Sequence, residues 1–159
     1  MKKEIKDLAE RKCVQRFLDF KNLENIYKNP KENEVDVFVK NKKDDILRFQ
    51  IVKADGSHFG EISKNIAHNN NSNKIYERSN INGDTKNVYK KIIDTIKNKG
   101  DIYKEQGKDM SKIILLLDDI GNIPNFILNQ IRSNHKELLI NSGFKEIWYV
   151  GTKTNFQFL

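Results

Sequence analysis

All five residues from Ile113 to Leu117 are apolar, and they lie between Lys112 and Asp118. A strand with one face in water alternates apolar and polar residues. An uninterrupted apolar run is instead typical of a central strand that is covered on both faces. The segment 112–118 therefore predicts a buried strand in a sheet with helices packed on both sides.

Three segments predict amphipathic helices, because their apolar residues recur at helical spacing. They cover residues 3–21, 86–103 and 125–142. Gly100 is an expected interruption of the second helix, and Gly143 is well placed to end the third. The expected apolar stripes are Ile5, Leu8, Ala9, Cys13, Phe17 and Leu18; Val88, Tyr89, Ile92, Ile93, Ile96 and Tyr103; and Phe126, Ile127, Ile131, Leu138 and Leu139.

Further strands are predicted at residues 34–39, 46–53 and 144–150, with 154–159 as an additional edge strand. The polar segment 41–45 joins the first two as a hairpin loop. Trp148 and Tyr149 are neighbours in one strand, so one is expected to point inward and the other outward. The fold class is α/β: a single domain over residues 1–159, with a central mixed four- to five-stranded sheet flanked by helices in the order αββαβαβ.

The composition is that of a soluble globular domain, with 159 residues and a net charge of +7. No apolar run is long enough to span a bilayer, and the single cysteine, Cys13, excludes an intrachain disulfide. A reducing, cytoplasmic location and no membrane partner are therefore expected. The three histidines share no metal-ligand spacing.

Basic residues are concentrated between Lys64 and Lys112, where eleven Lys/Arg accompany six Asp/Glu. This excess is compatible with a polyanionic partner such as DNA, although a general bias toward Lys and Asn would also produce it. The residues expected to contact nucleic acid lie within or beside this region and follow an Asn-rich tract at residues 69–73. They are Tyr76, Arg78, Lys86 and Lys90.

Polar residues interrupt two of the predicted strands. Asp36 lies within 34–39, and Gln50 and Lys53 lie within 46–53. Polar groups that are buried without partners cost free energy, so such positions often serve a site. The alternative is that all three are surface residues of half-exposed strands. Glu10, in the first predicted helix, is by itself typical of a solvated helix face.

The order of elements and these residues together resemble the PD-(D/E)XK nuclease-like superfamily, which is also called restriction-endonuclease-like. Four short passages carry the resemblance over most of the chain. They are Ala9-Glu10-Arg11 in the first helix, Glu34-Val35-Asp36, Phe49-Gln50-Ile51-Val52-Lys53-Ala54, and the helix and buried strand from Ile96 to Asp118.

The resemblance implies a Mg²⁺- or Mn²⁺-dependent endonuclease that hydrolyses DNA phosphodiester bonds. Asp36 would be the principal metal ligand, Gln50 would take the second ligand position through its amide oxygen, and Glu10 would assist from the helix. A nearby lysine would position the attacking water or stabilise the transition state. Small members of this superfamily are expected to form a homodimer in order to cut both strands.

The sequence departs from the family pattern at two positions. Gln50 replaces an acid and removes one negative charge, and Val52 occupies the place of the lysine, which comes one residue later at Lys53. In a regular strand Lys53 points away from the face of Gln50, so a bulge would be needed to reunite them. Alternatively, Lys86, Lys90 or another helix lysine would take the place of Lys53. The two departures favour the alternative of a catalytically inactive nuclease-fold protein that binds nucleic acid or a partner protein, for example in a defence or immunity system. An interaction protein with an unrelated α/β fold is a third hypothesis.

Two adjacent acids, Asp118 and Asp119, follow the buried apolar run. Ligand sites in α/β sheets often lie beyond the carboxyl ends of strands. A turn cap and a metal site are the two interpretations of this pair.

Overall fold

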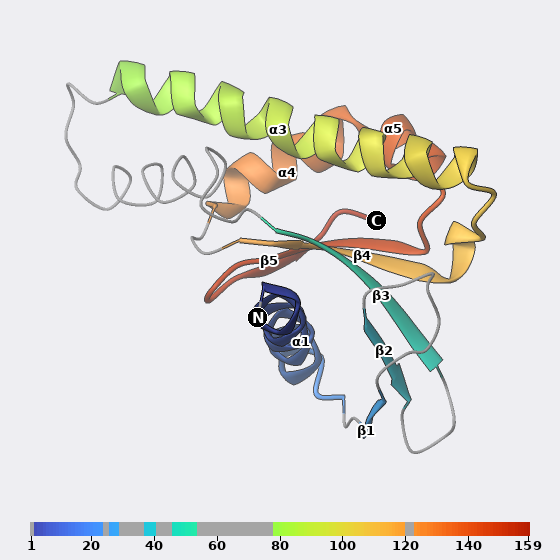
Figure 1. Ribbon diagram of the computed structural model, residues 1–159. Coiled ribbons are helices and arrows are strands. Elements are labelled where there is room, and N and C mark those ends of the chain that lie inside the picture. The colour runs from blue at the N-terminus through green and yellow to red at the C-terminus, as the bar shows by residue number, and fades with distance from the viewer. Residues whose placement is uncertain (1, 24–25, 29–36, 41–45, 54–77, 120–122) are drawn as a thin grey trace.

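The protein is described by a computed structural model that covers residues 2–23, 26–28, 37–40, 46–53, 78–119 and 123–159, without the side chains of 2–7, 26–28, 40, 53 and 78–88. Figure 1 shows the elements. They are α1 (Lys2–Phe20), β1 (Ile26–Lys28), β2 (Val37–Lys40), β3 (Ile46–Lys53), α3 (Arg78–Glu105), the 3-10 helix Met110–Lys112, β4 (Ile113–Asp118), α4 (Asn125–Asn134), α5 (Lys136–Asn141), β5 (Glu146–Val150) and β6 (Asn155–Gln157).

The described strands form one mixed sheet in the order β1-β2-β3-β4-β5-β6. β1, β2 and β3 pair antiparallel, β3, β4 and β5 pair parallel, and β6 returns antiparallel to β5. The described elements therefore form one mixed α/β domain, as predicted. The sheet has six strands where four to five were expected, because β1 falls in a segment for which no strand is predicted.

The parallel strands require helical crossovers, and the described helices of these connections lie on one face of the sheet (Figure 1). α3 joins β3 to β4, and α4 with α5 joins β4 to β5. α1 covers the opposite face. Among the described residues, no helix combines the length and apolar character needed to cross a membrane.

β4 is the centre of two hydrophobic cores. Leu115 and Leu117 pack with α3, α4 and α5, whereas Ile114 and Leu116 pack with α1. All five apolar residues of β4 are at most 3% exposed. The prediction of a strand covered on both faces is therefore confirmed.

The buried stripe of α1 differs from the predicted one. Leu8, which was expected to be buried, is 55% exposed, while Glu10 is only 3% exposed. Cys13 and Phe17 are buried as expected. Glu10 lies one turn before Cys13 on the same side of the helix, so the α1 face that meets the sheet begins with a carboxylic acid.

The second and third predicted helices differ in detail from α3, α4 and α5. α3 begins at Arg78 and continues through Gly100, where an added Cβ would lie 3.0 Å from the carbonyl oxygen of Ser142. The helix predicted for 125–142 is divided between α4 and α5 at His135, and Phe126 is 55% exposed instead of buried. Gly143 follows α5 with φ +90°, as expected of a residue that ends a helix.

Trp148 and Tyr149 are both buried, at 5% and 0% exposure. They point to opposite faces of β5: Trp148 toward the α1 side, and Tyr149 toward α3 and α4. The expectation that one of them points outward is wrong, because helices cover both faces of this strand.

Candidate functional site at the carboxyl ends of the central strands

The ladder between β3 and β4 is regular. Residues 48 to 53 pair one to one with residues 113 to 118, without a skipped position. A bulge would place two residues of one strand opposite a single residue of the other. The described β3–β4 ladder therefore has no bulge that could bring positions 50 and 53 onto one face.

Gln50 is 8% exposed and lies on the side of the sheet covered by α3. Its register partner is Leu115, which packs in the α3-side core, and Val52 also packs against that core. The alternating residues Phe49 and Ile51 pack on the α1 side instead. Gln50 is therefore not a surface residue of a half-exposed strand.

Position 53 is in phase with Phe49 and Ile51, on the α1 side of the sheet. Its register partner is Asp118. By strand phase, position 53 therefore lies on the face of the sheet that carries Asp118, opposite the face of Gln50.

The residues predicted to form the metal site are not all brought together. Glu10 is buried on α1, so the sheet separates it from Gln50. Asp36 lies outside the described residues, although its sequence neighbour Val37 pairs with Phe49. Glu10 and Gln50 share no face of the sheet, whereas Glu10 and position 53 belong to the same side.

This arrangement does not fit a metal ion held jointly by Gln50 and Glu10. Mg²⁺ requires oxygen ligands at about 2.0–2.1 Å, which two groups on opposite faces of a sheet do not supply to one ion. Within the ranges described, no group of three His, Cys, Asp or Glu side chains is placed to hold a metal ion. Asp36 lies outside those ranges.

Three of the four residues predicted to contact nucleic acid lie in the first half of α3. Arg78, Lys86 and Lys90 all belong to this helix, and the Lys90 side chain is exposed. Tyr76 lies outside the described residues, and the side chains of Arg78 and Lys86 are also undescribed. The α3 helix therefore collects three of these four positions, and their contact with nucleic acid stays a prediction.

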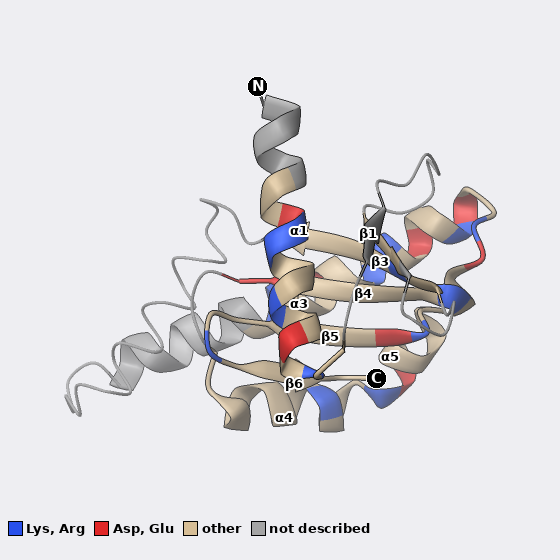
Figure 2. Ribbon diagram, turned by 90° about the horizontal axis from the view of Figure 1, so that it is seen from below, with Lys and Arg blue, Asp and Glu red and all other residues tan. Residues whose placement is uncertain are grey.

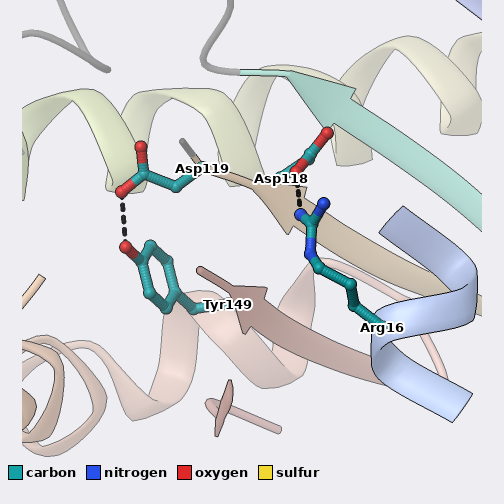
Figure 3. A network of polar contacts seen from close by, with 4 residues as sticks. All are labelled: Arg16, Asp118, Asp119 and Tyr149. Carbon is teal, nitrogen blue, oxygen red and sulfur yellow. Dashed lines mark hydrogen bonds and ion pairs between the residues drawn. The ribbon is translucent and has the colours of Figure 1, made fainter. Parts of the chain in front are cut away.

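Asp118 is held from α1. Arg16 donates a hydrogen bond through Nη2 to Oδ1 of Asp118 at 2.5 Å, and the two also form an ion pair (Figure 3). The Asp118 side chain is 15% exposed and the Arg16 side chain is 37% exposed. This pair links α1 to the carboxyl end of the central strand.

Asp119 points to the other side of the sheet, where the Tyr149 hydroxyl group donates a hydrogen bond to its Oδ2 atom (Figure 3). The same hydroxyl oxygen accepts a hydrogen bond from the backbone N–H of Ile123 at 2.9 Å. Burial, with the nearby Asp119 as a second cause, raises the pKa of Tyr149 well above its ordinary value. Tyr149 therefore stays protonated and keeps donating to Asp119.

The described contacts of the acid pair go to two other side chains, Arg16 for Asp118 and Tyr149 for Asp119. The two carboxylates point to opposite sides of the sheet and so do not converge on one metal ion, whereas the turn-cap interpretation concerns residues 120–122, which lie outside the described residues. The pair does lie where β3, β4 and β5 end together, which is the edge where α/β sheets usually bind ligands. The candidate site is this edge on the α1 side: Arg16, Asp118 and position 53, with Glu10 on the same face.

The sequence offered little signal for Arg16. It follows Lys12 by one helical turn, but its partner Asp118 is 102 residues away in the chain. Figure 2 shows the α1 side of the sheet, with α1 lying across the strands and carrying both basic and acidic residues. Arg16 meets Asp118 because α1 lies across the strands of the sheet.

A scan against protein-family models found no match, and searches of the curated proteins and of the solved structures found no significant match either.

Proposed function

We propose that this chain is a DNA-binding protein that has a nuclease-like α/β sheet and does not cleave DNA through an acid-x-lysine site. The regular β3–β4 ladder is the observation that carries this proposal. It places positions 50 and 53 on opposite faces, and Gln50 brings no negative charge for a metal ion. The order of α1, the antiparallel hairpin β2–β3, α3 and the parallel strand β4 supports the nuclease-like resemblance.

Charge supports the choice of DNA as the partner. The chain carries a net charge of +7. Lys12 is exposed on α1, and Lys90, Lys91 and Lys97 are exposed on α3. Cations that neutralise phosphates release counterions, and this release drives DNA binding regardless of base sequence.

A Mg²⁺-dependent deoxyribonuclease is the second candidate function. Glu10, only 3% exposed, supports it, because a buried carboxylate on the same side as position 53 and Asp118 is not typical of a solvated helix face. In this candidate, Asp36 would bind the metal ion together with the acids on the α1 side of the sheet, and Gln50 would not be a ligand. The homodimer expected for cutting both strands belongs to this candidate.

Two assays on the purified full chain separate the candidates. Fluorescence anisotropy with a labelled DNA duplex measures affinity from about 50 to 200 mM KCl, where phosphate contacts make binding strongly salt-dependent. Incubation of supercoiled plasmid with Mg²⁺ or Mn²⁺ measures cleavage. We expect salt-dependent binding and intact plasmid.

Nicked or linear plasmid would favour the second candidate, provided that Asp36→Ala abolishes the cleavage. Cleavage that survives Asp36→Ala would point to a contaminating nuclease or to a different site. The absence of any DNA binding at low salt would refute the proposed function.

A further inference from the structure

We propose that Arg16 contacts a DNA phosphate at the carboxyl end of β4, and that Asp118 is its positioning residue. This inference rests on the proposed DNA binding and names a phosphate-contacting residue for it. It also predicts that Asp118 competes with the phosphate for the same guanidinium group.

Within the part of the chain that the structure describes, a single side chain holds the Arg16 guanidinium group. Only Nη2 donates to a described acceptor, the Asp118 carboxylate at 2.5 Å. Arginine carries five N–H donors in a planar fork, which matches the geometry of carboxylate and phosphate groups. One contact fixes the orientation of the fork and leaves most of its donors available to a second anion.

The Nε atom of Arg16 adds an independent observation. It is buried and has no hydrogen-bond partner within the described part of the chain. A buried donor without an acceptor is costly, so the ion pair with Asp118 does not by itself satisfy the guanidinium group among the described residues. The Arg16 side chain is nevertheless 37% exposed, so an incoming phosphate can reach other parts of the guanidinium group.

The surroundings of Arg16 also favour an anion. Lys12 is exposed one turn earlier on α1, which places a second cation on the same flank of the helix. Lys53 occupies the position in β3 that pairs with Asp118. Lys12 therefore adds a positive charge beside the guanidinium group, whose own charge is balanced by Asp118.

Asp118 has a double effect in this arrangement. It holds the guanidinium group at the end of the sheet, but it also occupies one N–H group and cancels part of the positive charge. Removing its charge should therefore strengthen phosphate binding, whereas removing the Arg16 charge should weaken it. A purely structural pair would make both variants less stable, and neither would bind DNA more tightly.

The test measures DNA affinity by fluorescence anisotropy over a range of KCl concentrations, using full-length variants whose folding is confirmed by circular dichroism. Arg16→Gln should bind about tenfold more weakly than wild type, the effect of one charge-assisted hydrogen bond. A plot of log K against log salt should become less steep, its negative slope shrinking in magnitude by about 0.9, the value for one phosphate contact. Arg16→Lys should keep the slope and bind at an intermediate affinity, because it keeps the charge but loses the fork.

Two matched variants control for net charge. Arg132→Gln removes an exposed arginine whose Nη atoms already bond to Asn129 and to the carbonyl oxygen of Gln157. Asp19→Asn removes an exposed acid from α1. Arg16→Gln should weaken binding more than Arg132→Gln does, and Asp118→Asn should strengthen it more than Asp19→Asn does.

Two outcomes would overturn the inference alone: equal affinities for Arg16→Gln and Arg132→Gln, or weaker binding by a folded Asp118→Asn protein. If Arg16→Gln does not fold, Arg16→Lys and Asp118→Asn decide the question. A wild-type protein that binds no DNA would instead refute the proposed function, and the inference with it.

Discussion

Tyr149→Phe removes one hydroxyl group from the centre of the fold and leaves the aromatic ring in place. The hydroxyl group donates to the Asp119 carboxyl group and accepts from the N–H of Ile123 at 2.9 Å. Tyr149 is 0% exposed, and Asp119 and Ile123 are each 1% exposed. Bulk water has little access to these buried groups, so the lost hydrogen bonds are not readily replaced.

The expected loss of stability follows from the two hydrogen bonds. A hydrogen bond to a charged group contributes about 1.5–3 kcal/mol, and one between neutral groups about 0.5–1.5 kcal/mol. The sum for these two bonds predicts that Tyr149→Phe lowers the free energy of unfolding by about 2–4.5 kcal/mol. Equilibrium unfolding in urea, followed by circular dichroism, measures this difference.

Tyr89→Phe is the matched control because it removes the same hydroxyl group from an exposed network. The Tyr89 hydroxyl group donates to the carbonyl oxygen of Gln130 at 3.3 Å and accepts from Nδ2 of Asn134 at 3.0 Å. Water replaces these exposed bonds, so we expect a loss below about 1 kcal/mol. Equal losses for the two variants would refute the argument that burial makes the Tyr149 network important.

The pH dependence adds a second measurement. The folded state raises the pKa of Tyr149, so its contribution is fully present below about pH 10, the ordinary tyrosine pKa, and is lost as the pH rises toward the folded value. Above about pH 10, wild type should therefore lose stability relative to Tyr149→Phe, by about 1.4 kcal/mol per pH unit. A stability difference that stays constant to higher pH would contradict the assigned pKa direction.

Three further predictions test the packing and the site. Gly143→Ala should lower stability by about 1–3 kcal/mol in urea unfolding, because φ is +90° and the new Cβ would lie 2.6 Å from Cε of Met110; unchanged stability would contradict this. Leu116→Ala should cost about 2–5 kcal/mol in the same assay, whereas Ile140→Ala, at a side chain that is 64% exposed, should change stability by less than about 0.5 kcal/mol; similar effects would place Leu116 outside the core. Gln50→Glu should not produce Mg²⁺-dependent plasmid cleavage, although it restores the missing acid, and cleavage by this variant would refute the assignment of positions 50 and 53 to opposite faces.

Strong local signals made some elements predictable. β4 was predicted from its uninterrupted apolar run, and Gly143 was predicted to end the helical segment that precedes β5. β1 was not predicted, because three residues next to a proline-containing segment carry too little periodic signal. The exposure of Phe126 was also not predicted. Helical spacing identifies the apolar face of a helix, but it does not show how far neighbouring elements cover that face.

The candidate site was predictable only in part. The phase of a regular strand already separates Gln50 from Lys53, and the β3–β4 ladder keeps that phase. The burial of Glu10 was not predicted, because a glutamate in an amphipathic helix is usually solvated. The burial of Glu10 depends on how α1 lies across the sheet.

The sequence by itself determined that this protein has a central strand buried on both faces, because Ile113 to Leu117 leave no polar side for water. The tertiary structure alone decided which charged groups meet at the end of that strand. Arg16 reaches Asp118, and Tyr149 reaches Asp119, through contacts between separate elements. Local periodicity depends on residues a few positions apart, whereas these contacts depend on how α1 and β5 lie against β4 in space.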